Sequence, residues 1–161
     1  MIRAILLKFI KRDQGGRLMR IRFIFEKGGI LEGDLKEEYG APQTIALLKQ
    51  LGKLTSLARH SRYSGREVYI PIPDSFLAPK EKYSIYISKG DITYWRAWRD
   101  DGMEPVISFF YGPERARSSQ GDEPVNIIGH IREDLISLAE IIGERIWLQG
   151  AEKVEIETLS D

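Results

Sequence analysis

The feature that most constrains this chain is a hydrophobic pattern that repeats every second residue. Within residues 18–26 one face would carry Met19, Ile21, Phe23 and Phe25, and the other would carry Arg20, Arg22 and Ile24. Successive side chains of a strand point to opposite sides, so this alternation is typical of a strand with one buried face. Lys27-Gly28-Gly29 then predicts a tight turn, and Ile30–Leu35 predicts the returning strand of a hairpin.

The same period recurs along most of the chain. Further strands are predicted at residues 2–10, 68–72, 82–87, 91–98, 105–111, 125–131, 144–149 and 153–158. Only two segments have helical spacing: residues 42–51, which begin with a proline and precede Gly52, and residues 132–142, which Gly143 would end. Many short strands with two helices predict a mainly β protein in which a closed barrel is covered by the helices. A two-sheet sandwich is the alternative.

Length and composition indicate one globular unit. The 161 residues include 42% hydrophobic and 30% charged side chains, with no repeat or linker that would divide them. We therefore expect a single domain over residues 1–161, with residues 1–17 as an N-terminal strand extension. The chain has no cysteine, which excludes disulfides, thiol catalysis and cysteine-based metal sites. Abundant isoleucine, arginine and glutamate also favour a thermophilic source.

The opening apolar stretch predicts neither a membrane span nor a secretory signal. It is interrupted by Arg3 and Lys8, is too short to cross a bilayer and lacks a small-residue cleavage site. The expected location is cytoplasmic, without a membrane partner.

Charge is balanced overall but unevenly distributed. Residues 1–22 carry seven bases against one acid, residues 49–66 carry five bases and no acid, and residues 133–161 carry eight acids against two bases. Clustered bases are typical of a nucleic-acid-binding face, with Tyr63, Tyr69 or the tryptophans as stacking partners. Alternatively, basic and acidic segments become neighbouring strands and neutralise one another. The neutral overall charge favours the second explanation.

Three short motifs occur in a characteristic order. They are GDITYW at residues 90–95, FFYGP at residues 109–113 with Ser118 beyond it, and PVNIIGHI at residues 124–131. With the opening hairpin at residues 20–35, they resemble a family of small prokaryotic cyclophilin-like proteins over about residues 18–159. The resemblance implies a cyclophilin-type eight-stranded barrel with two helices. It implies no activity, since that family is a domain of unknown function.

Aromatic side chains are concentrated in residues 91–111, which hold six of the sixteen. Because Tyr94-Trp95 and Phe109-Phe110-Tyr111 are consecutive, alternation forces at least one ring of each group off the core face. Such rings would form an outer groove for a peptide segment or small molecule, with the loop at residues 112–122 over or beside it. The predicted ligand-binding residues are Tyr94, Trp95, Arg96, Trp98, Phe110, Tyr111, Ser118 and Asn126. Filling the barrel interior is the alternative role for each ring.

Residues for catalysis, metals and cofactors do not stand out. True cyclophilins carry a strand of the form FHR-x-x-x-x-F-M-x-QGGD, which this sequence lacks, so prolyl isomerase activity is only a second alternative, with Arg96 as the possible donor. His60 and His130 lie far apart and fit no metal-ligand spacing, and Asp100-Asp101-Gly102 predicts a turn. We expect no metal, no cofactor and no assignable catalytic residue.

Residues 2–10 would form a dimer if they stay unpaired in their own chain, so the protein is expected to be a monomer or a homodimer.

Overall fold

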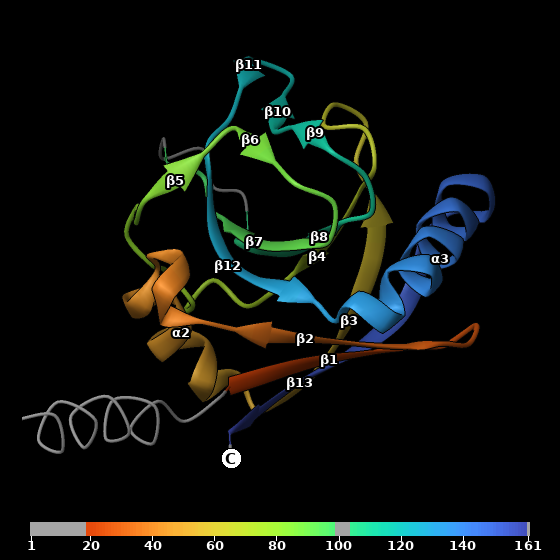
Figure 1. Cartoon of the computed structure of the whole chain (residues 1–161), viewed down its shortest axis with the longest axis horizontal. Coiled ribbons are helices and arrows are strands. Elements are labelled where there is room, and N and C mark those ends of the chain that lie inside the picture. The colour runs from red at the N-terminus through yellow and green to blue at the C-terminus, as the bar shows by residue number, and fades with distance from the viewer. Residues whose placement is uncertain (1–18, 99–103, 161) are drawn as a thin grey trace, which may run out of the picture.

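Eight antiparallel strands form a closed barrel (Figure 1). Around the barrel they follow the order β2-β1-β13-β3-β4-β8-β7-β12, and β12 pairs with β2 to close the ring. The barrel strands are β1 (Met19–Phe25), β2 (Ile30–Leu35), β3 (Lys53–His60), β4 (Glu67–Pro71), β7 (Asp91–Trp95), β8 (Val106–Phe110), β12 (Val125–Ile131) and β13 (Glu152–Ser160). The predicted mainly β fold with a closed eight-stranded barrel and two helices is confirmed, and the sandwich is not observed.

This computed structural model describes residues 19–98 and 104–160. The predicted strand at residues 2–10, the extension at residues 1–17 and the turn at residues 100–102 lie outside the described residues.

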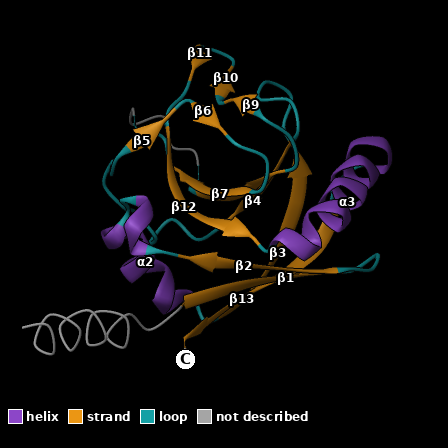
Figure 2. Ribbon diagram, viewed as in Figure 1, coloured by secondary structure: helices purple, strands orange, loops and turns teal. Residues whose placement is uncertain are grey.

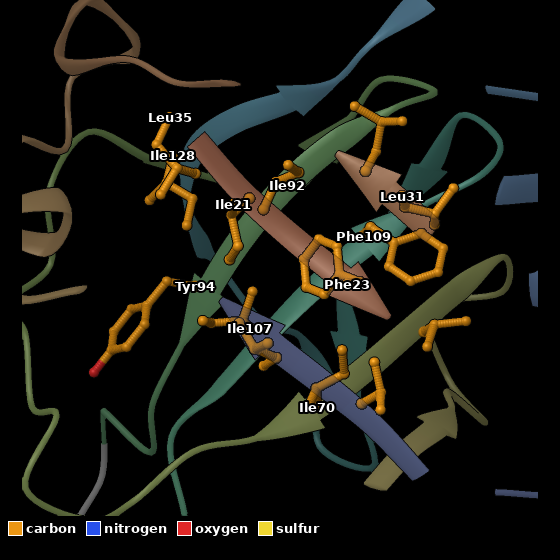
Figure 3. Close-up of a cluster of buried hydrophobic side chains, with 14 of the residues drawn as sticks. Ile21, Phe23, Leu31, Leu35, Ile70, Ile92, Tyr94, Ile107, Phe109 and Ile128 are labelled. Atoms are coloured by element: carbon orange, nitrogen blue, oxygen red, sulfur yellow. The ribbon is translucent and has the colours of Figure 1, made fainter. Parts of the chain in front are cut away.

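The barrel interior is filled by the alternating side chains that the sequence predicts. On β1 the four residues Met19, Ile21, Phe23 and Phe25 are buried, while Arg20, Arg22 and Ile24 are more exposed. The Phe23 and Phe109 ring centroids lie 5.8 Å apart, and Ile21, Ile70, Ile92 and Ile107 surround them in Figure 3. Since the apolar faces of all eight strands meet inside, closure buries one large cluster and leaves no open sheet edge on the barrel.

Five very short strands lie outside the barrel, on the side away from β1 and β13 in Figure 1. They are β5 (Tyr83–Ser84), β6 (Tyr86–Ile87), β9 (Glu114–Arg115), β10 (Arg117–Ser118) and β11 (Gly121–Asp122). The continuous strand predicted at residues 82–87 is therefore wrong. The chain changes partner there, because β5 pairs with β12 whereas β6 pairs with β9. The segment at residues 112–122, predicted as a loop, contains three of these short strands.

Two α-helices lie on opposite sides of the barrel (Figure 2). The first, α2 (Pro42–Leu48), continues as a 3₁₀ turn at Lys49–Leu51, so the helix predicted at residues 42–51 is confirmed. A further 3₁₀ turn, Glu37–Tyr39, precedes it. Ile45 and Leu48 of α2 are buried in the barrel cluster, which fixes the helix against the core.

The second helix is longer than predicted. A 3₁₀ turn at Glu133–Leu135 leads into α3 (Ile136–Gln149), which runs past Gly143. The strand predicted at residues 144–149 is therefore wrong. Ala139, Ile142, Gly143 and Ile146 form one buried stripe at helical spacing, so Gly143 belongs to the packed face and does not end the helix.

Two strand assignments also differ from the sequence prediction. β3 lies within the basic stretch at residues 49–66, where no strand is predicted. β4 is paired on both sides, with β3 and with β8, but its β3 pairing ends at Tyr69, before Pro71. The strand predicted at residues 91–98 ends at Trp95.

Acidic and basic side chains meet across the barrel surface. Arg22 contacts Glu32 at 2.8 Å and Glu157 at 3.5 Å, and Lys53 contacts Glu155 at 3.3 Å. The contacts with Glu157 and Glu155 join the basic N-terminal and central segments to the acidic C-terminal strand, whereas the contact with Glu32 joins β1 to β2. The uneven charge along the sequence is thus partly neutralised on the folded surface.

Candidate functional site

A cavity of about 310 Å³ lies on the outer face of the barrel. Its barrel wall consists of side chains that alternate away from the core, namely Glu67 and Tyr69 on β4, Trp95 on β7, Val106 on β8 and Val125 on β12. Trp95 and Val106 are direct cross-strand partners, so the barrel wall of the cavity is continuous between β7 and β8.

Two connecting segments, together with Ala97 and Trp98, form the remaining wall of the cavity. One joins β3 to β4 and contributes residues 61–64, and the other contributes residues 116–120 and Glu123. The Ser64 side chain holds them together: its hydroxyl accepts the Arg117 N–H at 2.9 Å and donates to the Arg117 carbonyl oxygen at 3.0 Å. The segment predicted to lie over or beside the groove therefore does line the cavity.

Both tryptophans of the cavity are held in place by their indole N–H groups. Trp95 Nε1 donates to Glu123 Oε1 at 3.1 Å, and Trp98 Nε1 donates to the Pro124 carbonyl oxygen at 2.8 Å. The Lys80 ammonium also lies 5.7 Å from the Trp98 ring centroid. These contacts fix the two rings and pre-form the aromatic wall, which reduces the ordering cost of a ligand packed against it.

Glu67 is the least expected member of the site. Burial raises the pKa of its carboxyl group, and hydrogen bonds with the hydroxyls of Ser108, Ser61 and Ser64 partly offset that rise. A titratable group that is shielded from bulk water but lines a cavity is a common component of functional sites. Glu123 is a second carboxylate of the cavity; in addition to the Trp95 contact, it accepts a hydrogen bond from Ser118 Oγ at 3.2 Å.

The predicted ligand-binding residues divide between the cavity and other positions. Trp95, Trp98 and Ser118 line the cavity, whereas Tyr94, Arg96, Phe110, Tyr111 and Asn126 do not.

Phe110 points outward, as the alternation argument requires for one ring of its group, yet it is fully buried. It packs with Ile87, Ala116 and Val125 in a second apolar cluster outside the barrel. The short strands cover the Phe110 ring. Phe110 is therefore part of the apolar layer behind the cavity and not of its lining.

Tyr94 and Asn126 point to the barrel interior and make structural hydrogen bonds. The Tyr94 hydroxyl donates to the Phe76 carbonyl oxygen at 2.6 Å and accepts the Ala78 N–H at 3.0 Å. Burial raises the pKa of this hydroxyl. Asn126 is fully buried, and its side-chain amide donates to Thr44 Oγ1 at 3.1 Å and to the Pro79 carbonyl oxygen at 2.9 Å.

Arg96 and Tyr111 also make contacts away from the cavity. Arg96 Nη1 donates to the Ala78 carbonyl oxygen at 3.4 Å. The Tyr111 hydroxyl lies 2.5 Å from His60 Nε2, and His60 Nδ1 lies 2.8 Å from the Ser61 carbonyl oxygen. In a neutral ring Nδ1 donates, so Nε2 accepts the tyrosine proton. Burial lowers the pKa of His60 and raises that of Tyr111.

The sequence prediction did not include Glu67, Tyr69 or Glu123 among the groove residues, and it named Tyr69 only as a possible stacking partner of a nucleic acid. Glu67 and Tyr69 alternate with the core residues Val68 and Ile70, so extending the predicted strand by one residue would have placed both on its outer face. Glu123 carries no comparable signal, because its approach to Trp95 depends on how a distant segment folds back.

The described residues contain neither a metal cluster nor a membrane-spanning helix. Within residues 19–98 and 104–160, no three His, Cys, Asp or Glu side chains are grouped so as to hold a metal ion. In the same part of the chain, no helix has both the length and the apolar character needed to cross a bilayer.

With the barrel and its outer cavity described, the chain can be compared with known proteins. Residues 28–158 match the family described as "Protein of unknown function (DUF3830)". The chain belongs to this family. The match covers every barrel strand except β1 and the last two residues of β13, and it includes the whole cavity of this DUF3830 protein. No curated protein matches the sequence.

A solved structure of McbB in complex with tryptophan is similar to this chain. The TM-score is 0.68 at 18% sequence identity, and the alignment covers 85% of this chain and 44% of McbB. At this level of identity the similarity shows a shared barrel fold alone. The DUF3830 chain spans less than half the length of McbB.

Proposed function

We propose that this DUF3830 protein binds a small molecule or a peptide segment in the outer cavity. The observation that carries the proposal is the cavity itself, in which a fixed aromatic wall faces a few polar groups. Its volume of about 310 Å³ is at the lower end of the range of roughly 300–1,000 Å³ that ligand pockets occupy. A cavity of this size suits a small molecule or one side chain of a peptide.

The proposed activity is binding without prolyl isomerase chemistry. Isomerisation requires a donor aimed at the prolyl nitrogen, and Arg96, the candidate donor, contacts the Ala78 carbonyl oxygen and does not line the cavity. A protease-coupled assay with a proline peptide tests this part of the proposal. A rate increase that is lost on replacing a cavity residue would overturn it.

The binding proposal is tested by NMR with four probes: tryptophol, tryptamine, indole-3-propionate and the peptide Gly-Trp-Gly. Indole-based probes suit the aromatic wall, and McbB, which shares the fold, has been solved with tryptophan. The chain has three tryptophans, so its indole N–H signals contain an internal control. At least one probe is expected to shift the Trp95 and Trp98 signals, while the signal of Trp147, an exposed residue of α3, stays in place.

Two variants make the test specific to the cavity. Val106→Trp should fill the cavity and abolish the shifts, and Trp98→Ala should weaken binding by about tenfold, or about 1.4 kcal/mol. Trp147→Ala is the matched control and should bind as the wild type does. The proposal is overturned if no probe shifts the Trp95 and Trp98 signals at millimolar concentration, or if Val106→Trp binds normally while remaining folded.

Nucleic-acid binding through residues 1–22 and 49–66 has less support. In the described part of these stretches, Arg22, Lys53 and Arg66 already contact acidic side chains. Retention on a polyanion column that falls steeply with salt would favour this alternative.

We further propose that the barrel is of the cyclophilin type. The three sequence motifs support this assignment, and the strand number and two helices agree with it. Superposition of the strand order on a cyclophilin tests it. Four further expectations stay predictions: the single domain over residues 1–161, the cytoplasmic location, the thermophilic source and the monomeric or homodimeric state.

A further inference from the structure

Glu67 places a carboxyl group in the cavity. It is the first residue of β4, and its outward direction follows from the strand, because Val68 and Ile70 on the opposite face are fully buried in the core. Tyr69 follows on the same outer face and lines the same cavity. An acid is thus positioned beside an aromatic wall by a rigid barrel strand.

The hydroxyl groups around Glu67 are themselves fixed. Ser61 and Ser108 are 7% and 1% exposed, and both contact the Glu67 carboxyl group. Ser61 Oγ accepts the N–H groups of Tyr63 at 3.2 Å and Ser64 at 3.0 Å. Since those two bonds use its lone pairs, its single hydrogen is available for the Glu67 carboxylate. The serine hydroxyls therefore provide hydrogen-bond donors around this carboxyl group.

Among the described residues, no basic side chain forms an ion pair with Glu67. Its neighbour Arg66 instead pairs with Glu114. Arg62 and Arg117 line the cavity. Among the described residues, neither of them forms an ion pair with the Glu67 carboxyl group within 4.0 Å. Serine hydroxyls donate hydrogen bonds but do not neutralise a charge, and a half-buried carboxylate without a counter-charge is unfavourable.

A cationic ligand would supply the missing counter-charge. An ammonium group forms short, charge-assisted hydrogen bonds with a carboxylate. The electron-rich faces of tryptophan and tyrosine also attract cations, and Trp98 already has Lys80 near its ring. The apolar part of such a ligand would pack against Trp95, Trp98 and Val106. A protonated amine on a small apolar or aromatic body therefore complements both halves of the cavity.

We propose that the cavity selects a small ligand with a protonated amine, which pairs with Glu67 while its apolar body lies against the aromatic wall. This inference rests on the binding function proposed above. It specifies the charge of the ligand and names Glu67 as the residue that recognises this charge.

The test compares three ligands that share one ring and differ in charge. Tryptamine carries an ammonium group, tryptophol carries a neutral hydroxyl group in its place, and indole-3-propionate carries a carboxylate. Their affinities for the full chain are measured by NMR titration at pH 7.5. Tryptamine is expected to bind about tenfold or more tightly than tryptophol, and indole-3-propionate is expected to bind most weakly.

Glu67→Gln removes the charge and keeps the shape of the side chain. In this variant tryptamine and tryptophol should bind within about threefold of each other, while tryptophol keeps its wild-type affinity. Glu123→Gln is the matched control, because it alters the other carboxylate of the cavity. It should preserve the ratio of the tryptamine and tryptophol affinities, even if both affinities change.

The outcomes separate this inference from the binding proposal. If tryptophol or indole-3-propionate binds the wild type as tightly as tryptamine does, binding stands and the selection of amines is refuted. The same conclusion follows if Glu67→Gln keeps the wild-type ratio. If none of the probes, including Gly-Trp-Gly, binds at the cavity, the binding proposal fails and the inference fails with it.

Discussion

Gly143 of α3 lies directly against the ring of Tyr111, so closely that a β-carbon on Gly143 would overlap the ring. Tyr111 in turn is held by the 2.5 Å contact between its hydroxyl and His60 Nε2. The glycine therefore permits α3 to approach the end of β8. Any side chain at this position must displace the helix or the ring.

Gly143→Ala is expected to destabilise the protein, although alanine favours helix formation by about 1 kcal/mol over glycine. Overpacking in a rigid core costs about 1–3 kcal/mol, and the overlap with the Tyr111 ring places this site at the upper end, so the net loss should be about 2 kcal/mol. Chemical denaturation measures it. Ser137→Ala, at an exposed position of the same helix, should change the free energy of unfolding by less than about 0.5 kcal/mol. Equal effects of the two substitutions would contradict the packing argument.

Glu67→Gln is expected to stabilise the ligand-free protein above neutral pH. Burial raises the folded-state pKa of Glu67, so between its ordinary value and the raised value the folded state binds more protons than the unfolded state. Stability then falls as pH rises through this window, and each unit of raised pKa costs about 1.4 kcal/mol above it. Thermal unfolding at pH 8 should therefore show a higher Tm for Glu67→Gln than for the wild type.

The same pair of proteins should converge at low pH. Near pH 4, below the ordinary pKa of glutamate, the Glu67 carboxyl group is mostly protonated in both states, so its pKa shift has little effect on the free energy of unfolding. Asp91, whose pKa burial also raises, is present in both proteins and cancels from the difference. A Tm difference that is constant from pH 4 to pH 8 would mean that Glu67 is not destabilised by burial.

Asn126→Ala is expected to weaken the fold but not ligand binding. The Asn126 side chain joins Thr44 of α2 to Pro79, and its Oδ1 accepts the Glu81 N–H at 3.0 Å. Buried groups that lose a partner cost about 1–3 kcal/mol each, so we expect a loss of about 2–4 kcal/mol on denaturation. Tryptamine affinity should stay unchanged, because Asn126 does not line the cavity. Gln43→Ala, at an exposed side chain, serves as control.

Arg145→Met is expected to be among the most destabilising surface substitutions. Arg145 Nε contacts Glu152 Oε1 at 2.8 Å, and the Glu152 side chain is 1% exposed. Removing the arginine leaves a buried carboxylate that, among residues 19–98 and 104–160, retains only the Lys27 N–H as a partner, at a cost of about 3–5 kcal/mol. Lys53→Met breaks an exposed ion pair and should cost less than about 1 kcal/mol. Comparison of their denaturant midpoints checks the contrast.

The barrel was predictable because local alternation and turn chemistry agree with it. Residues 18–35 show this best: the buried face of β1, the glycine turn and the returning β2 all follow from the sequence. β3 was missed because Leu54 and Leu57 are three residues apart and fall on opposite faces, and only Ala58 of the strand is fully buried. The end of α3 was misplaced because glycine stops a helix in many contexts, and its packing against Tyr111 is a long-range contact.

The candidate site was predictable only in part. Alternation indicated that one ring of each consecutive aromatic group faces outward, and Trp95 and Phe110 do so. It did not distinguish the ring that lines a cavity from the ring that lies under the short strands. That difference depends on how residues 83–87 and 114–122 fold over the barrel, which is set by contacts between distant segments.

The place of β13 in the barrel also bears on biosynthesis. β13 pairs with β1 on one side and with β3 on the other. During translation both of these strands emerge from the ribosome long before their shared neighbour, with their inward-facing apolar side chains uncovered. Barrel closure therefore waits until residues 152–160 are available, and until then the uncovered strands can pair with other chains.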